Sequence, residues 1–294
     1  MAAVAEAGEN MKPLWGTQVL VLAVNVPGPA AAARLHELGA TVVKVEPPEG
    51  DPLAKANQGW YQALAYRQKV IRLNLKETGD RTRLDALLGE SDLLLTATRP
   101  VALKRLGLDW SELHSRYPRL SQTAIVGYPA PKENVPGHDL TYLAGLGLLT
   151  PPELPRTLLA DLAGAERAVS ASLALLLGRE LGQGTGYAQV PLAEAAAFFA
   201  EPLRYGITTP GGMLGGGLPS YNLYRARDGW ISLAALEPHF RQKLLDKLGL
   251  QTADREELAS VFLTRAAEEW QTWAAERDLP IAALRQASPI EEGG

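Results

Sequence analysis

The chain has 294 residues, of which 46% are hydrophobic and 21% are charged, and its net charge is −4. This length and apolar content suffice for one large domain or two smaller ones with a sizeable core. A chain without a basic surplus is not expected to bind nucleic acid or an acidic membrane. The absence of cysteine excludes disulfides, thiolate nucleophiles and cysteine-based zinc sites. No two of the four histidines share a close metal-ligand spacing, so no metal site is expected.

The beginning of the chain carries no pattern typical of a secretion signal. The first ten residues are polar and small, and no apolar run reaches the roughly 18 residues that span a bilayer. We therefore expect a soluble, cytoplasmic protein.

The first two thirds of the sequence alternate between strand and helix patterns. An apolar run at residues 18–24 predicts a strand buried on both faces, and a Pro-Gly segment then leads into a helix at 30–38. A β-branched run at 41–46 completes a βαβ unit with a parallel crossover. The alternation predicts an α/β domain with a mostly parallel sheet. Its further strands are expected at 70–75, 91–95, 120–126 and 187–190, and its further helices at 80–88, 100–106, 110–117, 164–181 and 192–205.

A different pattern follows in the last third. The glycine-rich stretch at 208–217 is typical of a linker or flexible loop. Two short strand patterns at 221–226 and 230–235 flank Arg-Asp-Gly and predict a hairpin. Helices are expected at 237–248 and 260–276, so this part predicts a small α+β domain.

Asp161 lies just before the predicted start of the long helix at 164–181. An Asp at such a place is most often a cap that accepts backbone N–H bonds. The same place offers free N–H groups and the positive end of a helix dipole, which could hold a thioester oxygen as it becomes an enolate. The residue type leaves both interpretations open.

His138 and Glu237 are the other candidates for acid–base chemistry. His138 follows a glycine that lets the backbone approach a ligand, and an imidazole titrates near neutral pH. Taken alone, this motif is better explained as a surface helix start capped by Asp139. Glu237 precedes a predicted helix, where the dipole favours a carboxylate. If it met His138 in space, it would orient the ring and raise its basicity.

A basic series lies before and after the predicted third strand. It is either a solvated face or a clamp for the phosphates of a nucleotide-like carrier. Its members are Arg67, Lys69, Arg72, Lys76 and Arg99.

Several motifs, in order over about residues 14–280, resemble those of one known family. Val-Pro-Gly-Pro at 26–29 and Gly-Ala-Thr-Val-Val-Lys-Val-Glu at 39–46 resemble its first βαβ unit, and residues 91–100 with 106–108 resemble its next block. The motifs that follow are Gly-His-Asp-Leu-Thr-Tyr at 137–142, Ala-Asp-Leu-Ala-Gly at 160–164, Gly-Arg-Glu at 178–180, Gly-Thr-Gly at 184–186 and Leu-Glu-Pro at 236–238. The chain resembles the family III CoA-transferases and α-methylacyl-CoA racemases (the CaiB/BaiF type).

The resemblance implies an α/β fold in which a Rossmann-like large domain binds CoA and a smaller α+β domain follows. It also implies a homodimer whose two chains are interlocked. The large domain is expected at 13–206, the linker at 207–217, the small domain at 218–280 and a tail, shorter than is usual in the family, at 281–294. CoA enters as part of the acyl-CoA substrate, and no metal or separate cofactor is implied. The residues implied in CoA binding are Arg67, Lys69, Leu73, Asn74, Leu75, Lys76, Arg99, Gly137, Asp139, Leu140, Thr141 and Tyr142.

Catalytic roles are also implied by the resemblance. In the racemases the positions matching His138 and Asp161 are paired bases, and the match of Glu237 supports the histidine. In the transferases the match of Asp161 is a nucleophile that forms an acyl anhydride and then a CoA thioester. The Gly-His-Asp and Leu-Glu-Pro motifs look more like the racemase branch, and racemisation needs one base on each face of the α-carbon. We therefore expect an acyl-CoA racemase or epimerase first, a CoA-transferase second and a non-catalytic relative third.

Departures from the family pattern fall where the adenine and phosphates of CoA are expected. The basic segment before the third strand, which usually contains glycine and serine, is Tyr-Arg-Gln-Lys at 66–69. Prolines follow the second strand, and the loop at 127–130 is Gly-Tyr-Pro-Ala rather than a Gly-Phe-Gly-Gln type. These changes bear on CoA binding more than on proton transfer.

Overall fold

The computed structural model describes residues 12–285. The chain divides after Ala200 into two compact units. Among the described residues, none of the helices combines the length and the apolar character that crossing a membrane requires.

A six-stranded parallel sheet forms the centre of the first unit, which confirms the predicted α/β domain. The strand order is β3-β2-β1-β4-β5-β6, so the order reverses between β1 and β4. At such a reversal the connections leave toward opposite faces and open a crevice at the carboxyl ends of the strands. The strands are β1 (Gln18–Leu22), β2 (Thr41–Glu46), β3 (Lys69–Arg72), β4 (Leu93–Thr96), β5 (Ser121–Val126) and β6 (Tyr187–Pro191).

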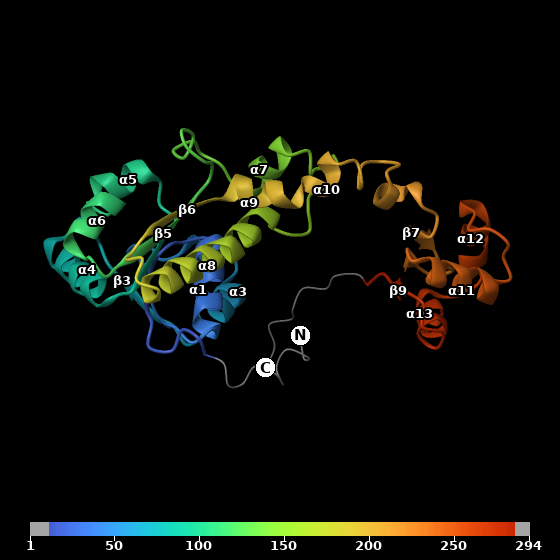
Figure 1. Ribbon diagram of the computed structural model, residues 1–294, viewed down its shortest axis with the longest axis horizontal. Helices are drawn as coiled ribbons and strands as arrows, with labels where there is room; N and C mark the ends of the chain where they lie inside the picture. The colour runs from blue at the N-terminus through green and yellow to red at the C-terminus, as the bar shows by residue number, and fades with distance from the viewer. Residues whose placement is uncertain (1–11, 286–294) are drawn as a thin grey trace. The chain divides into compact units, whose positions relative to one another are not determined.

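Helices cover both faces of this sheet, which explains why its central strands are apolar on both sides. In β1, Val19 and Val21 belong to the core shared with α1 and α8, whereas Leu20 belongs to the core shared with α4, α5 and α6. Figure 1 shows α8 lying along α1. The helices are α1 (Pro27–Glu37), α2 (Pro52–Ala56), α3 (Gln58–Leu64), α4 (Thr78–Glu90), α5 (Pro100–Arg105), α6 (Trp110–Arg116), α7 (Asp139–Gly145), α8 (Leu159–Glu180) and α9 (Leu192–Phe199).

The long helix α8 begins at Leu159, before the predicted start near residue 164. The prediction was wrong because Gly164 is not at a helix end. A Cβ atom on Gly164 would lie 2.1 Å from Cδ2 of Leu192, so the missing side chain allows α8 to pack closely against the start of α9. The helix predicted at 192–205 ends at Phe199, and the short α10 (Glu201–Arg204) opens the second unit.

The second unit contains the predicted hairpin, formed by β7 (Tyr221–Arg225) and β8 (Trp230–Ala234). A third strand, β9 (Ile281–Ala283), pairs with β8, so residues expected in the tail belong to the sheet. Residues 286–294 of that predicted tail lie outside the described part of the chain. The helix predicted at 237–248 is confirmed as α11 (Pro238–Leu248).

One prediction for the second unit was wrong in detail. Residues 260–276 form two helices, α12 (Arg255–Phe262) and α13 (Ala267–Ala275), rather than one. The indole N–H of the buried Trp270 donates to the carbonyl of Phe262 at 2.8 Å, which holds the two helices as a bent pair. The glycine-rich stretch forms a compact turn that includes the π-helical segment η2 (Met213–Gly217), in which the N–H of Leu214 donates to the carbonyl of Ile207 at 2.8 Å.

A buried charge cluster lies where β2 ends. Lys44 Nζ is 2.7 Å from Glu46 Oε1 and 2.5 Å from Asp51 Oδ2, and all three side chains are at most 3% exposed. Burial alone would raise the pKa of Glu46, but hydrogen bonds from Lys44 and Tyr61 outweigh it and lower this pKa. The backbone N–H of Asn25, beyond β1, donates to Asp51 Oδ1 at 3.0 Å. The cluster therefore ties the segment after β2 to the segment after β1.

Replacing Lys44 by methionine is expected to destabilise the first unit by about 3–5 kcal/mol, because two buried carboxylates lose their cation. Urea unfolding followed by circular dichroism measures the loss. Arg83→Met is the matched control, because Arg83 pairs with Asp80 at the surface, where a pair contributes at most about 1 kcal/mol. Equal losses in the two variants would contradict the structural role of the cluster.

Candidate active site

A cavity of about 240 Å³ lies at the carboxyl ends of β1, β4 and β5, where the strand order reverses. His138, Tyr142 and Asp161 all line this cavity, which we call the switch-point cavity. The first unit alone therefore brings together the imidazole and the carboxyl group that the sequence singled out. Open α/β sheets bind ligands in this position.

Asp161 is the third residue of α8 rather than its cap. Its backbone N–H donates to Asp139 Oδ1 at 3.0 Å. Asp139 is only 6% exposed and is the first residue of α7, so its carboxylate joins the first turns of α7 and α8. The N–H of Asp161 itself therefore already has an acceptor, and the expectation that N–H groups near Asp161 hold an enolate oxygen stays a prediction.

The Asp161 carboxyl group is electrostatically unusual. Its pKa is raised from 3.8 to about 6, first by burial and second by the nearby charge of Asp139, while His138 acts in the opposite direction. A carboxyl group with a pKa near neutrality can both accept and return a proton under ordinary conditions.

His138 occupies the N-cap position of α7 and is exposed. Its backbone N–H donates to Thr141 Oγ1 at 3.0 Å, and the Thr141 hydroxyl donates to the His138 carbonyl at 2.7 Å. These bonds fix the backbone and leave the ring at the cavity wall. Asp139, expected to be the cap of a plain surface helix, instead serves the first turn of α8.

Tyr142 is packed between two glycines in the wall of the cavity. A Cβ atom on Gly137 would lie 2.6 Å from Tyr142 Cε1, and one on Gly127 would lie 2.5 Å from the Tyr142 hydroxyl oxygen. No side chain other than hydrogen fits at either position. Burial raises the pKa of Tyr142 to about 12, so the phenol stays protonated and can donate a hydrogen bond.

The predicted CoA-binding residues are distributed over more than one place. Leu73, Asn74, Leu75 and Lys76 line a second cavity of about 450 Å³, which we call the carrier cavity. It lies beyond the carboxyl ends of β1, β2 and β3 and shares Val24 with the switch-point cavity.

Other residues of the predicted set lie elsewhere. Arg99 and Gly137 line the switch-point cavity. Arg67 and Lys69 are at the amino end of β3, where they line neither cavity, and the Arg67 guanidinium lies 5.1 Å from the centre of the Tyr66 ring. Leu140 is exposed.

Glu237 precedes α11 in the second unit. Its meeting with His138 in the other unit stays a prediction.

Two further polar residues of the switch-point cavity were missed by the sequence reasoning. Asn25 lies directly beyond β1, and Glu133 lies in the loop between β5 and α7. A polar residue after an apolar strand was a usable signal for Asn25, because carboxyl ends of parallel strands meet at one edge of the sheet. The position of Glu133 depends on the path of a loop that carries no periodic pattern.

Comparisons with known proteins identify relatives over most of the chain. A family model described as CoA-transferase family III matches residues 14–292. The chain is 26% identical to the cinnamoyl-CoA:phenyllactate CoA-transferase of Clostridium sporogenes, over 93% of this chain and 78% of that protein. It is 28% identical to the human α-methylacyl-CoA racemase, over 87% of this chain and 74% of that protein.

Solved structures give the same result. The crystal structure of the Mycobacterium tuberculosis protein Rv3272 superposes with a TM-score of 0.82 at 26% identity, covering 93% of this chain and 84% of that one. A CaiB/BaiF family protein from Brucella suis shares the fold, with a TM-score of 0.75 at 20% identity, over 93% of this chain and 84% of that chain. The chain belongs to CoA-transferase family III, a group that includes both CoA-transferases and an α-methylacyl-CoA racemase.

Proposed function

We propose that this protein is an acyl-CoA racemase or epimerase that moves the α-proton of a 2-methylacyl-CoA-like thioester by a two-base mechanism. The observation that carries the proposal is that His138 and Asp161 line one cavity, in which the Asp161 carboxyl group has a pKa of about 6. Two acid–base groups, one for each face of the α-carbon, are what inversion of a carbon acid requires.

The proton transfers follow from this pair. In one direction the Asp161 carboxylate removes the α-proton, and the electron pair of the C–H bond moves to the thioester oxygen to give an enolate. A protonated His138 then gives a proton to the opposite face of the carbon, and the reverse direction exchanges the two roles. The protonated phenol of Tyr142 is a donor for the enolate oxygen in the same cavity.

The remaining parts of the proposal concern the carrier and the support of the histidine. The carrier cavity, with Lys76 in its wall, takes part of the CoA, and Arg99 offers its guanidinium to a phosphate. The Glu237 carboxylate supports the ring of His138. The reaction needs no separate cofactor and takes place in the cytoplasm.

A CoA-transferase is the second candidate, because several relatives, including the (R)-2-hydroxy-4-methylpentanoate CoA-transferase of Clostridioides difficile, carry that name. In that reaction Asp161 attacks the thioester carbonyl, forms an acyl anhydride and releases the CoA thiolate. The thiolate then converts the anhydride to an aspartyl CoA thioester and releases the first acid, and a second carboxylic acid finally takes the CoA. His138 has no necessary part in this sequence.

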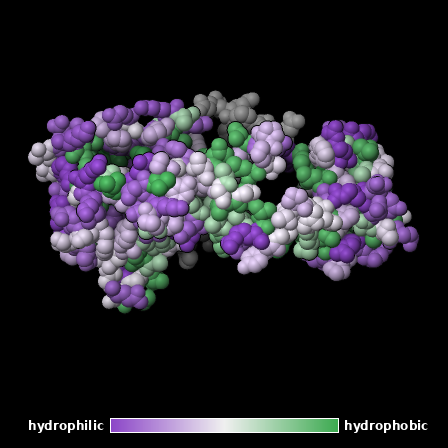
Figure 2. All heavy atoms as spheres, turned by 90° about the horizontal axis from the view of Figure 1, so that it is seen from above, coloured by the Kyte–Doolittle hydropathy of each residue, from purple (hydrophilic) through white to green (hydrophobic). Residues whose placement is uncertain are grey.

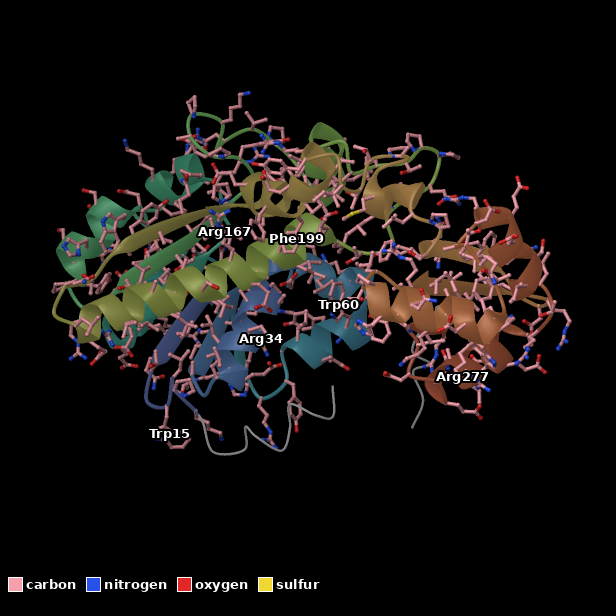
Figure 3. The ribbon with its side chains drawn as sticks, turned by 45° about the vertical axis from the view of Figure 1, so that its right-hand side comes forward. Trp15, Arg34, Trp60, Arg167, Phe199 and Arg277 are labelled. Atoms are coloured by element: carbon pink, nitrogen blue, oxygen red, sulfur yellow. The ribbon has the colours of Figure 1, made fainter. Side chains whose placement is uncertain are left out.

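We also propose an interlocked homodimer, supported by apolar side chains at the surface of the first unit (Figure 2). A groove between α8 and α9 is lined by Arg167, Phe198 and Phe199, and Phe198 is 71% exposed. Figure 3 labels Arg167 and Phe199 on these two helices. Adjacent exposed phenylalanines are unusual on a monomer and are typical of surfaces that a second chain covers.

The proposed reaction predicts that the wild-type protein exchanges the α-hydrogen of 2-methylacyl-CoA for deuterium with one thioester alone. Asp161→Asn and His138→Ala are each expected to slow exchange at least a hundredfold, because each removes one acid–base group. NMR or mass spectrometry of the recovered thioester measures the exchange. Glu166→Gln, an exposed change on the same helix as Asp161, is the control and should exchange like the wild type.

The transferase alternative predicts a different outcome of the same assay. Exchange would be absent, CoA transfer would require a second carboxylic acid, and hydroxylamine would trap an acyl group on Asp161. His138→Ala would then retain most of the transfer activity. The absence of exchange, transfer and acyl-CoA binding would indicate a non-catalytic relative.

The raised pKa of Asp161 predicts the pH dependence of exchange. Where Asp161 is the base, kcat/KM should fall as the pH decreases through about 6, because the protonated carboxyl group cannot accept the α-proton. If Asp161 had an ordinary pKa of about 3.9, kcat/KM would not change as the pH decreases to about 5. Asp139→Asn removes a charge that raises this pKa and should move the fall to lower pH. A flat profile between pH 5 and 7 would contradict Asp161 as the base.

The dimer predicts a mass of twice 31.6 kDa in solution, measured by light scattering. Phe198→Glu should reduce this mass toward that of one chain, because a charge in a covered apolar groove opposes association. Leu154→Glu alters a similarly exposed apolar residue outside the groove and is the control. A wild-type mass of 31.6 kDa would contradict the dimer.

A further inference from the structure

Asn25 has an unusual backbone conformation in the wall of the switch-point cavity. Its φ is 65°, in the left-handed region that residues other than glycine seldom adopt. The bond from its N–H to Asp51 Oδ1 fixes this conformation, because Asp51 is itself buried and paired with Lys44. The charge cluster thus holds the residue that carries the carboxamide at the cavity.

The Asn25 carboxamide forms no hydrogen bond with the described residues. Asn25 is exposed, and no hydrogen bond among residues 12–285 involves its side chain. A carboxamide offers two N–H donors and an oxygen acceptor. Asn25 lines the cavity that also holds His138 and Asp161, so its carboxamide is available to a ligand there.

Glu133 supplies a second uncommitted polar group to the same cavity. Its Oε2 atom is buried and has no hydrogen-bond donor among the described residues. Within that part of the chain Glu133 also forms no ion pair, although Arg99 lines the same cavity. A buried acceptor without a donor is costly unless a ligand or water satisfies it, so the site favours a ligand that brings an O–H or N–H group.

The size and charge of the cavity limit what that ligand can be. Its volume of about 240 Å³ is smaller than the roughly 300–1,000 Å³ of sites for drug-sized molecules, so it suits a short chain. A carboxylate at Glu133 disfavours a second carboxylate on the acyl group. A hydroxyl group, in contrast, can both donate to a carboxylate such as Glu133 and accept from a carboxamide such as Asn25.

We propose that the switch-point cavity selects a short acyl group that carries a hydroxyl group, and that Asn25 and Glu133 recognise this hydroxyl group. The proposal rests on the proposed function, in which the α-carbon of the thioester lies between His138 and Asp161. A hydrocarbon chain of the same length would displace water from both polar groups and leave them unpaired. A site built to hydrogen-bond a hydroxyl group discriminates strongly against the analogue that lacks it.

The test compares 3-hydroxy-2-methylbutanoyl-CoA with 2-methylbutanoyl-CoA, which differ by one hydroxyl group on the same carbon skeleton. Dissociation constants and α-deuterium exchange are measured for both thioesters with the full chain. The wild type is expected to bind the hydroxylated thioester at least tenfold more tightly and to exchange it with at least tenfold higher kcat/KM.

Two variants assign the preference to the named residues. Asn25→Gly removes the carboxamide and keeps a residue that accepts the left-handed conformation, and Glu133→Leu removes the carboxylate. Each is expected to reduce the binding preference to about threefold or less. Lys132→Leu, an exposed change in the same loop, is the matched control and should keep the wild-type preference.

Each result decides the proposal. Equal binding of the two thioesters, or tighter binding of the hydrocarbon, overturns it, as does a preference that both variants retain. A binding preference that depends on Asn25 and Glu133 without any α-exchange supports the acyl selection and overturns the proposed racemisation. Failure to bind either thioester overturns both.

Discussion

One hydrogen bond, from the backbone N–H of Asp161 to the carboxylate of Asp139, joins the two helices that carry the candidate acid–base pair. Because His138 is the neighbour of Asp139 in the chain, this bond also holds the backbone of His138 near the start of α8. The same carboxylate contributes to the raised pKa of Asp161, second to burial. The Asp139 carboxylate therefore has two effects: it joins the helices that carry the pair, and it raises the pKa of Asp161.

Another buried carboxylate, that of Asp51, holds Asn25 in the wall of the switch-point cavity. Asp51 accepts the N–H groups of Asn25 and Leu53 while it pairs with Lys44. These bonds connect the ends of β1 and β2 and keep Asn25 in a conformation that an unconstrained chain would avoid. Glu46, in the same cluster, lines the carrier cavity, so one set of charges supports the walls of both cavities. A ligand that spans the two cavities would contact a single rigid framework.

The parts of this structure that follow from local patterns could be predicted from the sequence. Apolar runs such as that of β1 identified the parallel strands, because strands buried on both faces need no polar alternation. The start of α8 was misplaced because Gly164 looks like a helix boundary, whereas it actually permits close packing against Leu192. That contact joins residues distant in the chain, and no local signal reports it.

The candidate site, too, could be predicted from the sequence only in part. His138 and Asp161 were found from their motifs, yet the interpretation of Asp161 as a helix cap was wrong, because Asp161 is the third residue of α8. Asp139 was expected to cap its own helix, and its bond to α8 could not be foreseen because it joins two elements separated by a loop. Asn25 and Glu133 reach the cavity through a strand end and a loop whose paths only the folded chain defines.

The two candidate reactions differ in which of the two side chains, Asp161 and His138, each one uses. Both need the Asp161 carboxyl group, so its presence does not distinguish them. A transferase uses the carboxylate as a nucleophile and has no task for the imidazole of His138. A two-base isomerase uses both groups and benefits from the raised pKa, because the carboxyl group must also return its proton. The shared cavity of His138 and Asp161 is why we propose proton transfer ahead of acyl transfer.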